Sequence, residues 1–132
     1  MATQAKTRLA AAPLYAVVPA TDIPRARRFY AETLGLEVDD RPDAGGFMVQ
    51  AGGGSSMLVY ETGASAGTAT QAAFQVDDLY AVVADLREHG ITFEEYDLPG
   101  LKTVDGIAEA GSMKTAWFKD SEGNIIAVSQ TP

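Results

Sequence analysis

The stretch TDIPRARRFYAETLG, residues 21–35, carries the signals of a helix from its start to its end. Asp22 is a suitable N-cap, and Pro24 fits the first helical turn, where its missing N–H costs little. Apolar residues follow at helical spacing, and Gly35 stands where many helices end in a left-handed glycine. The stretch therefore predicts a short amphipathic helix.

Strands are predicted on both sides of this helix. Residues 14–18, LYAVV, are apolar and favour a strand, and Pro19 should end it because proline cannot donate to a sheet ladder. Three antiparallel strands should follow the helix, in LEVDDRPDAGG, FMVQAG and MLVYE. GGGSS between the last two lacks the lysine and the following helix of a phosphate loop, so we interpret it as a hairpin turn.

The same order of elements returns after a linker of small residues, 62–69. A strand in QAAFQV leads into DDLYAVVADLREHG, where Asp77 or Asp78 caps a helix with an apolar stripe and Gly90 ends it. Strands are then predicted in ITFEEYDL, KTAWFKD and NIIAVSQ, with a long loop over residues 99–112 that is either a flap or a solvated loop.

The two halves align with a constant offset, because Tyr15 falls on Gln71 and Asp22 on Asp78, each 56 positions apart. The chain is therefore predicted to use a βαβββ unit twice. One unit leaves the inner face of its curved sheet uncovered, so two units should enclose a cleft with the helices outside. The expected fold class is α+β, with paired half-barrel sheets.

Length and composition fit one domain, since 132 residues with 46% hydrophobic residues can bury a single core. We expect a flexible lead-in without the apolar run of a signal peptide or membrane span, followed by one domain built from two repeats. The expected boundaries are 1–12 for the lead-in, 13–132 for the domain, and 13–61 and 70–130 for the repeats. The chain has no cysteine, which excludes disulfides and thiolate sites and favours a cytoplasmic location.

Charge argues against nucleic-acid partners, and the lack of a long apolar run argues against a membrane partner. The formal net charge is −8, and the basic cluster RARR, residues 25–28, is expected on a helix beside other charges. The single histidine, His89, suits the C-terminal end of its helix, and Asp120 and Glu122 are interpreted as turn residues. None of these groups needs a catalytic role.

The helix sequence DIPRARRFYAETLGL is similar to the signature helix of the vicinal oxygen chelate superfamily, which includes glyoxalase I, bleomycin-resistance proteins and extradiol dioxygenases. FQVDDLYAVVADLREHGI and WFKDSEGNIIAVSQ resemble the second half of that family, so the similarity spans residues 13–130. The resemblance implies two βαβββ repeats. It also implies a homodimer, in which the partner completes or narrows each cleft.

Metal-using members of that family place ligands, usually His, Gln or Glu, on the first, fourth, fifth and eighth strands. The resemblance puts Tyr15, Leu58, Gln71 and Ala127 at these points, with Tyr60 on the same face as Leu58. Tyrosine and glutamine offer two neutral donors at best, and an unaided phenol ionises only near pH ~10. No metal or other cofactor is therefore expected.

The last strand should give the cleft a small, mostly apolar wall, which suits a hydrophobic or aromatic ligand. Trp117 is either a stacking surface or part of the core, and Tyr15 and Gln71 either orient a ligand or bond each other or water. Parity alone does not fix the face of the other large side chains Phe47, Met57, Tyr96 and Met113. The expected ligand-binding residues are Tyr15, Leu58, Tyr60, Gln71, Trp117, Ile125 and Ala127.

The sequence favours a small-molecule binding protein of the glyoxalase/bleomycin-resistance type. The alternative is a metal-dependent lyase, isomerase or dioxygenase with displaced ligands, for instance Glu61, Glu94 or Glu95 with Gln71. Glu61 would need a bulge or a register slip to point inward. A third possibility is an interaction module whose cleft is filled by its own side chains. The residues leave open whether the protein is an enzyme.

Overall fold

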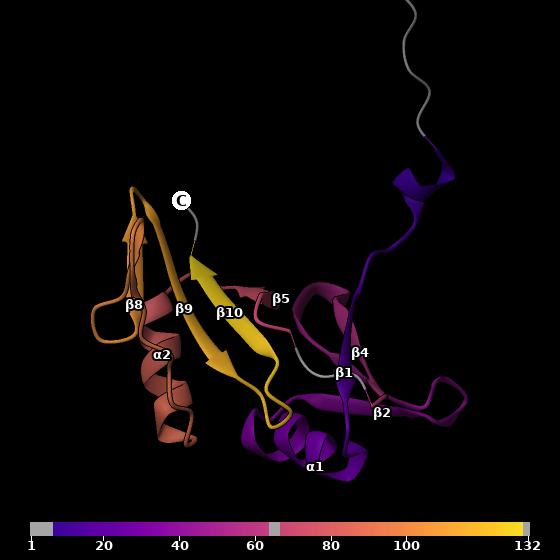
Figure 1. Cartoon of the computed structure of the whole chain (residues 1–132). Coiled ribbons are helices and arrows are strands. Elements are labelled where there is room, and N and C mark those ends of the chain that lie inside the picture. Colours follow the sequence, from indigo (N-terminus) through magenta and orange to yellow (C-terminus); the bar gives the residue numbers. More distant parts are fainter. Residues whose placement is uncertain (1–6, 64–66, 131–132) are drawn as a thin grey trace, which may run out of the picture.

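Two four-stranded sheets lie side by side in the computed structural model, each with one helix on its outer side (Figure 1). Strands β1 and β5 contact each other where the sheets meet. We call residues 13–61 the first half and residues 70–130 the second half. The structure describes residues 7–63 and 67–130; parts of the expected lead-in, linker and C-terminus, at 1–6, 64–66 and 131–132, lie outside the described residues.

The first half orders its sheet β1-β4-β3-β2, with β1 parallel to β4 and the other neighbours antiparallel. A 3-10 turn, η1 (Arg8–Ala11), precedes it. Its elements are β1 (Ala16–Ala20), α1 (Ile23–Arg28), the π-helical turn η2 (Phe29–Thr33), β2 (Glu37–Arg41), η3 (Pro42–Ala44), β3 (Gly46–Gln50), η4 (Gly52–Gly54) and β4 (Ser56–Glu61).

The predicted helix signals of residues 21–35 are confirmed. The Asp22 side chain accepts the N–H of Arg25 at 3.0 Å, Pro24 lies in the first turn, and Gly35 has a φ of +68°. The helix changes to a π turn at Phe29, and Leu34 N–H reaches back to the Phe29 carbonyl at 3.0 Å. The cap and the glycine together hold this short helix at both ends.

The prediction that Pro19 ends the first strand is wrong, because Pro19 lies inside β1. In the hydrogen-bonded sheet β1 is an edge strand that pairs only with β4. The Pro19 carbonyl accepts a hydrogen bond from Asn124 Nδ2 at 2.9 Å, so this carbonyl faces away from β4. Proline is tolerated there because no ladder partner needs its missing N–H.

The second half repeats this topology with the sheet order β5-β10-β9-β8. Asp78 caps its helix by accepting the N–H of Ala81, with φ and ψ of −136° and 95°, against −134° and 96° for Asp22. Gly90 follows with a φ of +91°. The elements are β5 (Thr70–Gln75), α2 (Leu79–Glu88), β6 (Asp97–Leu98), β7 (Leu101–Lys102), β8 (Ile107–Ala110), β9 (Met113–Lys119) and β10 (Ile125–Gln130).

The strand predicted at 91–98 and the loop predicted at 99–112 are both wrong in part. Only an isolated bridge between Phe93 and Phe118 continues the sheet there, and the edge beside β9 is taken by β8, inside the expected loop. Between these two pieces the chain leaves the sheet as residues 95–106, which we call the excursion. It carries the small β6–β7 ladder.

Side-chain hydrogen bonds hold the excursion together. Thr103 is buried; its hydroxyl accepts the N–H of Tyr96 at 2.7 Å and donates to Glu95 at 2.6 Å. The same carboxylate accepts the N–H of Gly106 at 2.8 Å. These local bonds give the backbone an alternative to the sheet ladder, which a propensity argument cannot foresee.

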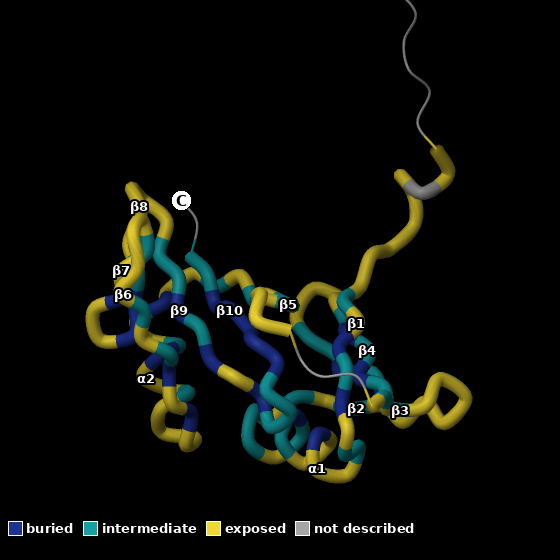
Figure 2. The backbone as a smooth tube through the Cα atoms, viewed as in Figure 1, coloured by how far each residue is buried: buried dark blue, intermediate teal, exposed yellow. Residues whose placement is uncertain are grey.

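The core consists of two clusters, each between a helix and its sheet (Figure 2). The first contains Val18, Tyr30, Phe47 and Val59, and the second contains Leu79, Val83, Phe118, Ile126 and Val128. Burial of each large apolar side chain contributes about 1.5 to 3 kcal/mol. No helix of the described residues covers the opposite face of either sheet. No helix in the described residues is long and apolar enough to cross a membrane.

The β9–β10 turn joins the second half to the first. Asp120 is buried and accepts the Tyr30 hydroxyl at 2.5 Å and Asn124 Nδ2 at 2.9 Å. Burial and the Asp120 carboxylate raise the pKa of Tyr30, so the phenol stays protonated and donates. Asp120 is therefore more than the turn residue that its position in the sequence predicts.

Glu122 in the same turn adds a second cap to α1. Its carboxylate accepts the backbone N–H groups of Thr21 and Asp22 at 3.0 and 3.1 Å and the Arg25 Nε at 2.7 Å. The Glu122 side chain is only 2% exposed. The hydrogen bond from Arg25, followed by the bonds from the backbone, lowers the pKa of Glu122 to about 2.

Candidate functional site

Six of the seven predicted ligand-binding residues lie on sheet faces turned away from the helices. We call these the first open face, formed by β1, β4 and β3, and the second open face, formed by β5, β10 and β9. Leu58 and Tyr60 of β4 lie on the first. Gln71, Trp117, Ile125 and Ala127 lie on the second. Tyr15 precedes β1 and is 51% exposed.

The second open face brings Trp117 and Ala127 together, because they are directly paired across β9 and β10. Ala127 is also paired with Ala73 of β5. Ile125 and Ala127 are buried while Trp117 is half-buried, and the Tyr96 ring meets the indole edge-on at a centroid distance of 5.5 Å. Trp117 is thus outside the helix-side core, and Tyr96 extends its aromatic surface.

Gln71 occupies a break in the register between β5 and β10. Ile125 pairs with Thr70 and Ile126 with Ala72, so Gln71 is the extra residue of a β-bulge. Its Oε1 atom is buried and has no hydrogen-bond partner in residues 7–63 and 67–130. A buried acceptor without a donor costs about 1 to 3 kcal/mol, so this oxygen is suited to a donor group on a ligand.

The first open face is apolar at its centre. Leu58 pairs with Val17 on one side and Met48 on the other, and Tyr60 is the next residue on the same face of β4. Val17 is 50% exposed. Phe47 and Met57, whose faces parity left open, point instead into the first core cluster. Strand alternation places Val17 and Met48 beside Leu58 on this face only once the register of β1, β4 and β3 is known.

A cleft of about 690 Å³ lies between the halves, at the start of β1. Tyr15, Met57 and Ser56 line it from the first half, and Ala73 and Phe74 line it from the second. Of the seven predicted residues only Tyr15 lines this cleft. Tyr15 is not the donor to the buried oxygen of Gln71, since that atom has no partner in the described chain.

The residues at the family's metal-ligand points do not fit a divalent ion. Leu58 and Ala127 supply no donor atom, Gln71 supplies one neutral oxygen, and Tyr15 supplies a phenol. No group of three His, Cys, Asp or Glu side chains in the described ranges is arranged to hold a metal.

The displaced ligands considered for a metal site are dispersed. Glu61 is exposed, and β4 pairs with β1 and β3 without the bulge that would turn it inward. The Glu95 carboxylate is occupied by Thr103 and Gly106 in the excursion. Glu94 alone lies beside the second open face, where its N–H bonds the Trp117 carbonyl and its carboxylate is 3.5 Å from Lys119.

Comparisons with solved structures find the same fold in several proteins. An antibiotic-binding protein, TnmS3 from Streptomyces sp. CB03234, is 25% identical, with 88% of this chain and 92% of that chain covered and a TM-score of 0.62. The oxidase ChaP-H2 is 25% identical over 89% and 91% of the two chains, with a TM-score of 0.64. A glyoxalase family protein from Bacillus anthracis is 18% identical over 100% of both chains, with a TM-score of 0.66.

A search of curated proteins finds no match to the sequence. The comparison with family models, by contrast, agrees with the structural likeness. A model of the Glyoxalase/Bleomycin resistance protein/Dioxygenase superfamily matches residues 13–128, which include both βαβββ units. The chain therefore belongs to the Glyoxalase/Bleomycin resistance protein/Dioxygenase superfamily.

Proposed function

We propose that the protein binds a hydrophobic or aromatic small molecule against its open faces and that no metal takes part. The observation that carries the proposal is the buried Oε1 of Gln71, which has no hydrogen-bond partner in the described residues and lies in a face that also holds Trp117, Ile125 and Ala127. An apolar surface with a few fixed polar groups is the usual composition of a small-molecule site.

The residues at the family's metal-ligand points and one structural relative support ligand binding rather than metal-assisted catalysis. Two of the four family ligand points carry aliphatic side chains, Leu58 and Ala127. TnmS3, at 25% identity, is an antibiotic-binding protein. The oxidase of the same identity is the reason to keep a lyase, isomerase or dioxygenase as the alternative. The ligand we expect is neutral, because the charged neighbours Glu94 and Lys119 pair with each other at 3.5 Å.

Trp117 makes the proposal directly testable, because it is the only tryptophan in the chain. Titration with a panel of aromatic natural products that includes bleomycin should change the tryptophan fluorescence in a saturable way for at least one compound. A ligand at 100 times its dissociation constant should also stabilise the fold by about 2.7 kcal/mol. A panel that changes neither fluorescence nor melting temperature would contradict the proposal.

A matched pair of variants separates binding at the open face from binding elsewhere. Ala127→Gln should block the hit compound, because Ala127 is buried between Trp117 and Ala73. Ala44→Gln makes the same change in an exposed turn and should leave binding unaltered. Equal binding by both folded variants would place the ligand away from the second open face.

We also propose that the protein works as a cytoplasmic homodimer and that residues 13–132 form one domain. Leu14 at 96% exposure, with Tyr15 and Val17 at about half, offers an apolar strip that a second copy would cover. The absence of cysteine supports a reducing compartment. Light scattering coupled to size-exclusion chromatography tests the dimer: a mass of one chain at micromolar concentration would contradict it.

A further inference from the structure

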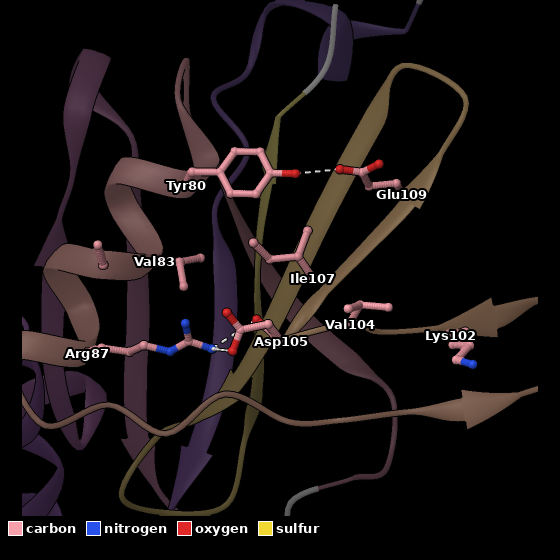
Figure 3. A pocket seen from close by; sticks show the side chains of 9 residues that line it. Tyr80, Val83, Arg87, Lys102, Val104, Asp105, Ile107 and Glu109 are labelled. Carbon is pink, nitrogen blue, oxygen red and sulfur yellow. Dashed lines mark hydrogen bonds and ion pairs between the residues drawn. The ribbon is translucent and has the colours of Figure 1, made fainter.

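A second cavity, of about 640 Å³, lies outside both open faces, between α2 and the excursion (Figure 3). Its floor is apolar, with Val83 and Ile107 buried and Val104 72% exposed along one side. Ligand sites commonly have volumes of about 300 to 1,000 Å³, so the cavity is large enough for a small molecule.

The cavity exists because the two repeats differ. Gly35 precedes the first residue of β3 by 11 positions, whereas Gly90 precedes the first residue of β9 by 23. The additional chain forms the excursion, which supplies Lys102, Val104 and Asp105 as a wall facing α2. β2 of the first half is the counterpart of β8, and only Leu36 stands between Gly35 and β2, so the first half has no such wall.

The wall is held in place by a cation of α2. Arg87 Nη2 donates to the Asp105 carbonyl at 2.9 Å and lies 3.5 Å from the Asp105 carboxylate, while the guanidinium stands over the Phe93 ring at 5.5 Å. Asp105 is the only non-glycine residue with positive φ in the described ranges, at +54°. A backbone conformation of this kind persists where its surroundings hold it, and such residues are frequent at binding sites.

Some of the charged side chains around the cavity have partners and others have none or only part of their hydrogen bonds made. At one end the Tyr80 hydroxyl donates to Glu109, and at the other Arg87 contacts Asp105 (Figure 3). Lys102 makes no ion pair with any residue in the described part of the chain, and only one nitrogen of Arg87 is used in the hydrogen bonds found there. The hydrogen-bond donors that remain available in the cavity therefore belong to the cationic side chains Lys102 and Arg87, although the chain as a whole carries a net charge of −8.

We propose that this cavity is a second ligand site, for a small amphipathic carboxylate. The apolar body of the ligand lies over Val83, Val104 and Ile107, and its carboxylate lies beside Lys102, at the side of the cavity away from the Arg87–Asp105 pair (Figure 3). The Lys102 ammonium can bind this carboxylate without giving up an ion pair in the described part of the chain. The site is independent of the open faces, so it stands whether or not those faces bind a ligand.

The test uses the full chain labelled with ¹⁵N and two probes with the same apolar body, 2-naphthylacetate and 2-naphthylacetamide. Amide resonances of Arg87, Asp105 and Ile107 should shift in a saturable way with the carboxylate, with a dissociation constant of about 1 mM or lower. The uncharged amide should bind about fivefold more weakly. Equal affinity of the two probes, or shifts confined to the open faces, would overturn the proposal.

Two variants and one control complete the test. Lys102→Ala should weaken the carboxylate about fivefold, while Arg28→Ala removes the same charge from an exposed site on α1 and should have no effect. Val104→Asp, at an exposed position where folding should not suffer, should remove binding of both probes. Unchanged binding in Lys102→Ala or in Val104→Asp, with the fold intact by its amide spectrum, would contradict the assigned site.

Discussion

The first and second halves share the same order of helix and strands, but the second half departs from regular strand pairing at two places. Their helices begin with aspartate caps of nearly identical geometry and end before glycines with positive φ. The first half pairs its strands in unbroken register. The second half contains the bulge at Gln71 and the excursion at 95–106. The shared features maintain the fold, and the departures are where we propose that ligands bind.

The halves also depend on each other unequally. The β9–β10 turn of the second half caps α1 and places Asp120 against Tyr30 of the first. The cap of α2, by contrast, is supplemented within its own half, where Gln130 accepts the N–H of Leu79 at 2.8 Å. The first half therefore requires the second for its helix terminus, and this asymmetry can be measured.

The largest effect is expected from Asp120→Ala, which leaves the Tyr30 hydroxyl and Asn124 Nδ2 without their buried acceptor. The free energy of unfolding should fall by about 3 to 5 kcal/mol. Urea unfolding at pH 7 measures it, with Asp43→Ala in the exposed η3 turn as the control. A loss below about 1 kcal/mol would show that this junction does not join the halves.

The next effect concerns pH and Glu122. Its pKa is lowered from 4.5 to about 2, so its contribution is complete above about pH 4.5 and is lost as the pH falls toward 2. Glu122→Gln should cost up to about 3 kcal/mol at pH 7, and the gap to the wild type should close on acidification. A gap that stays constant from pH 7 to pH 2.5 would refute this role of the carboxylate.

A smaller effect, of opposite sign, is expected from Gln71→Met. Removing a buried acceptor that has no donor within residues 7–63 and 67–130 should raise the free energy of unfolding by about 1 to 2 kcal/mol without ligand. The same change should weaken any ligand that donates to Gln71. Gln50→Met, a half-buried site on β3, is the matched control. If Gln71→Met destabilises the protein, the oxygen is already satisfied, for instance by water.

The smallest effects are expected from removal of the aspartate N-caps of α1 and α2. Asp22→Ala and Asp78→Ala should each cost about 1 kcal/mol, because the two carboxylates accept equivalent backbone N–H groups at 3.0 and 3.2 Å. Thermal unfolding of both single variants measures the difference. A cost for one several times that of the other would contradict the equivalence of the repeats.

Most of the fold could be predicted because its signals are local. Asp22 and Gly35, like Asp78 and Gly90, mark helix ends through their own backbone preferences, and hydrophobic spacing identifies the faces between them. The edge beside β9 could not be predicted in this way. There the bonds of Thr103 to Glu95 and Tyr96 compete with the ladder, and they depend on contacts that a strand pattern does not encode.

The candidate site was less accessible to sequence reasoning for a related reason. The strand faces of Ile125 and Ala127 follow from alternation, but the bulge that isolates Gln71 depends on the register between β5 and β10. The tertiary roles of Asp120 and Glu122 arise from residues about 90 to 100 positions away. The cavity beside α2 needed the excursion, whose shape no local signal specified.

The most direct test of the account asks whether ligand binding at Trp117 needs a metal. The compound that gives the strongest fluorescence change is titrated into protein treated with EDTA and dialysed, and again after addition of Mn²⁺, Fe²⁺ or Zn²⁺, with metal content measured on the untreated protein. We predict the same affinity in every sample and far less than one bound ion per chain. Binding that disappears with EDTA and returns with one of these ions would contradict the account.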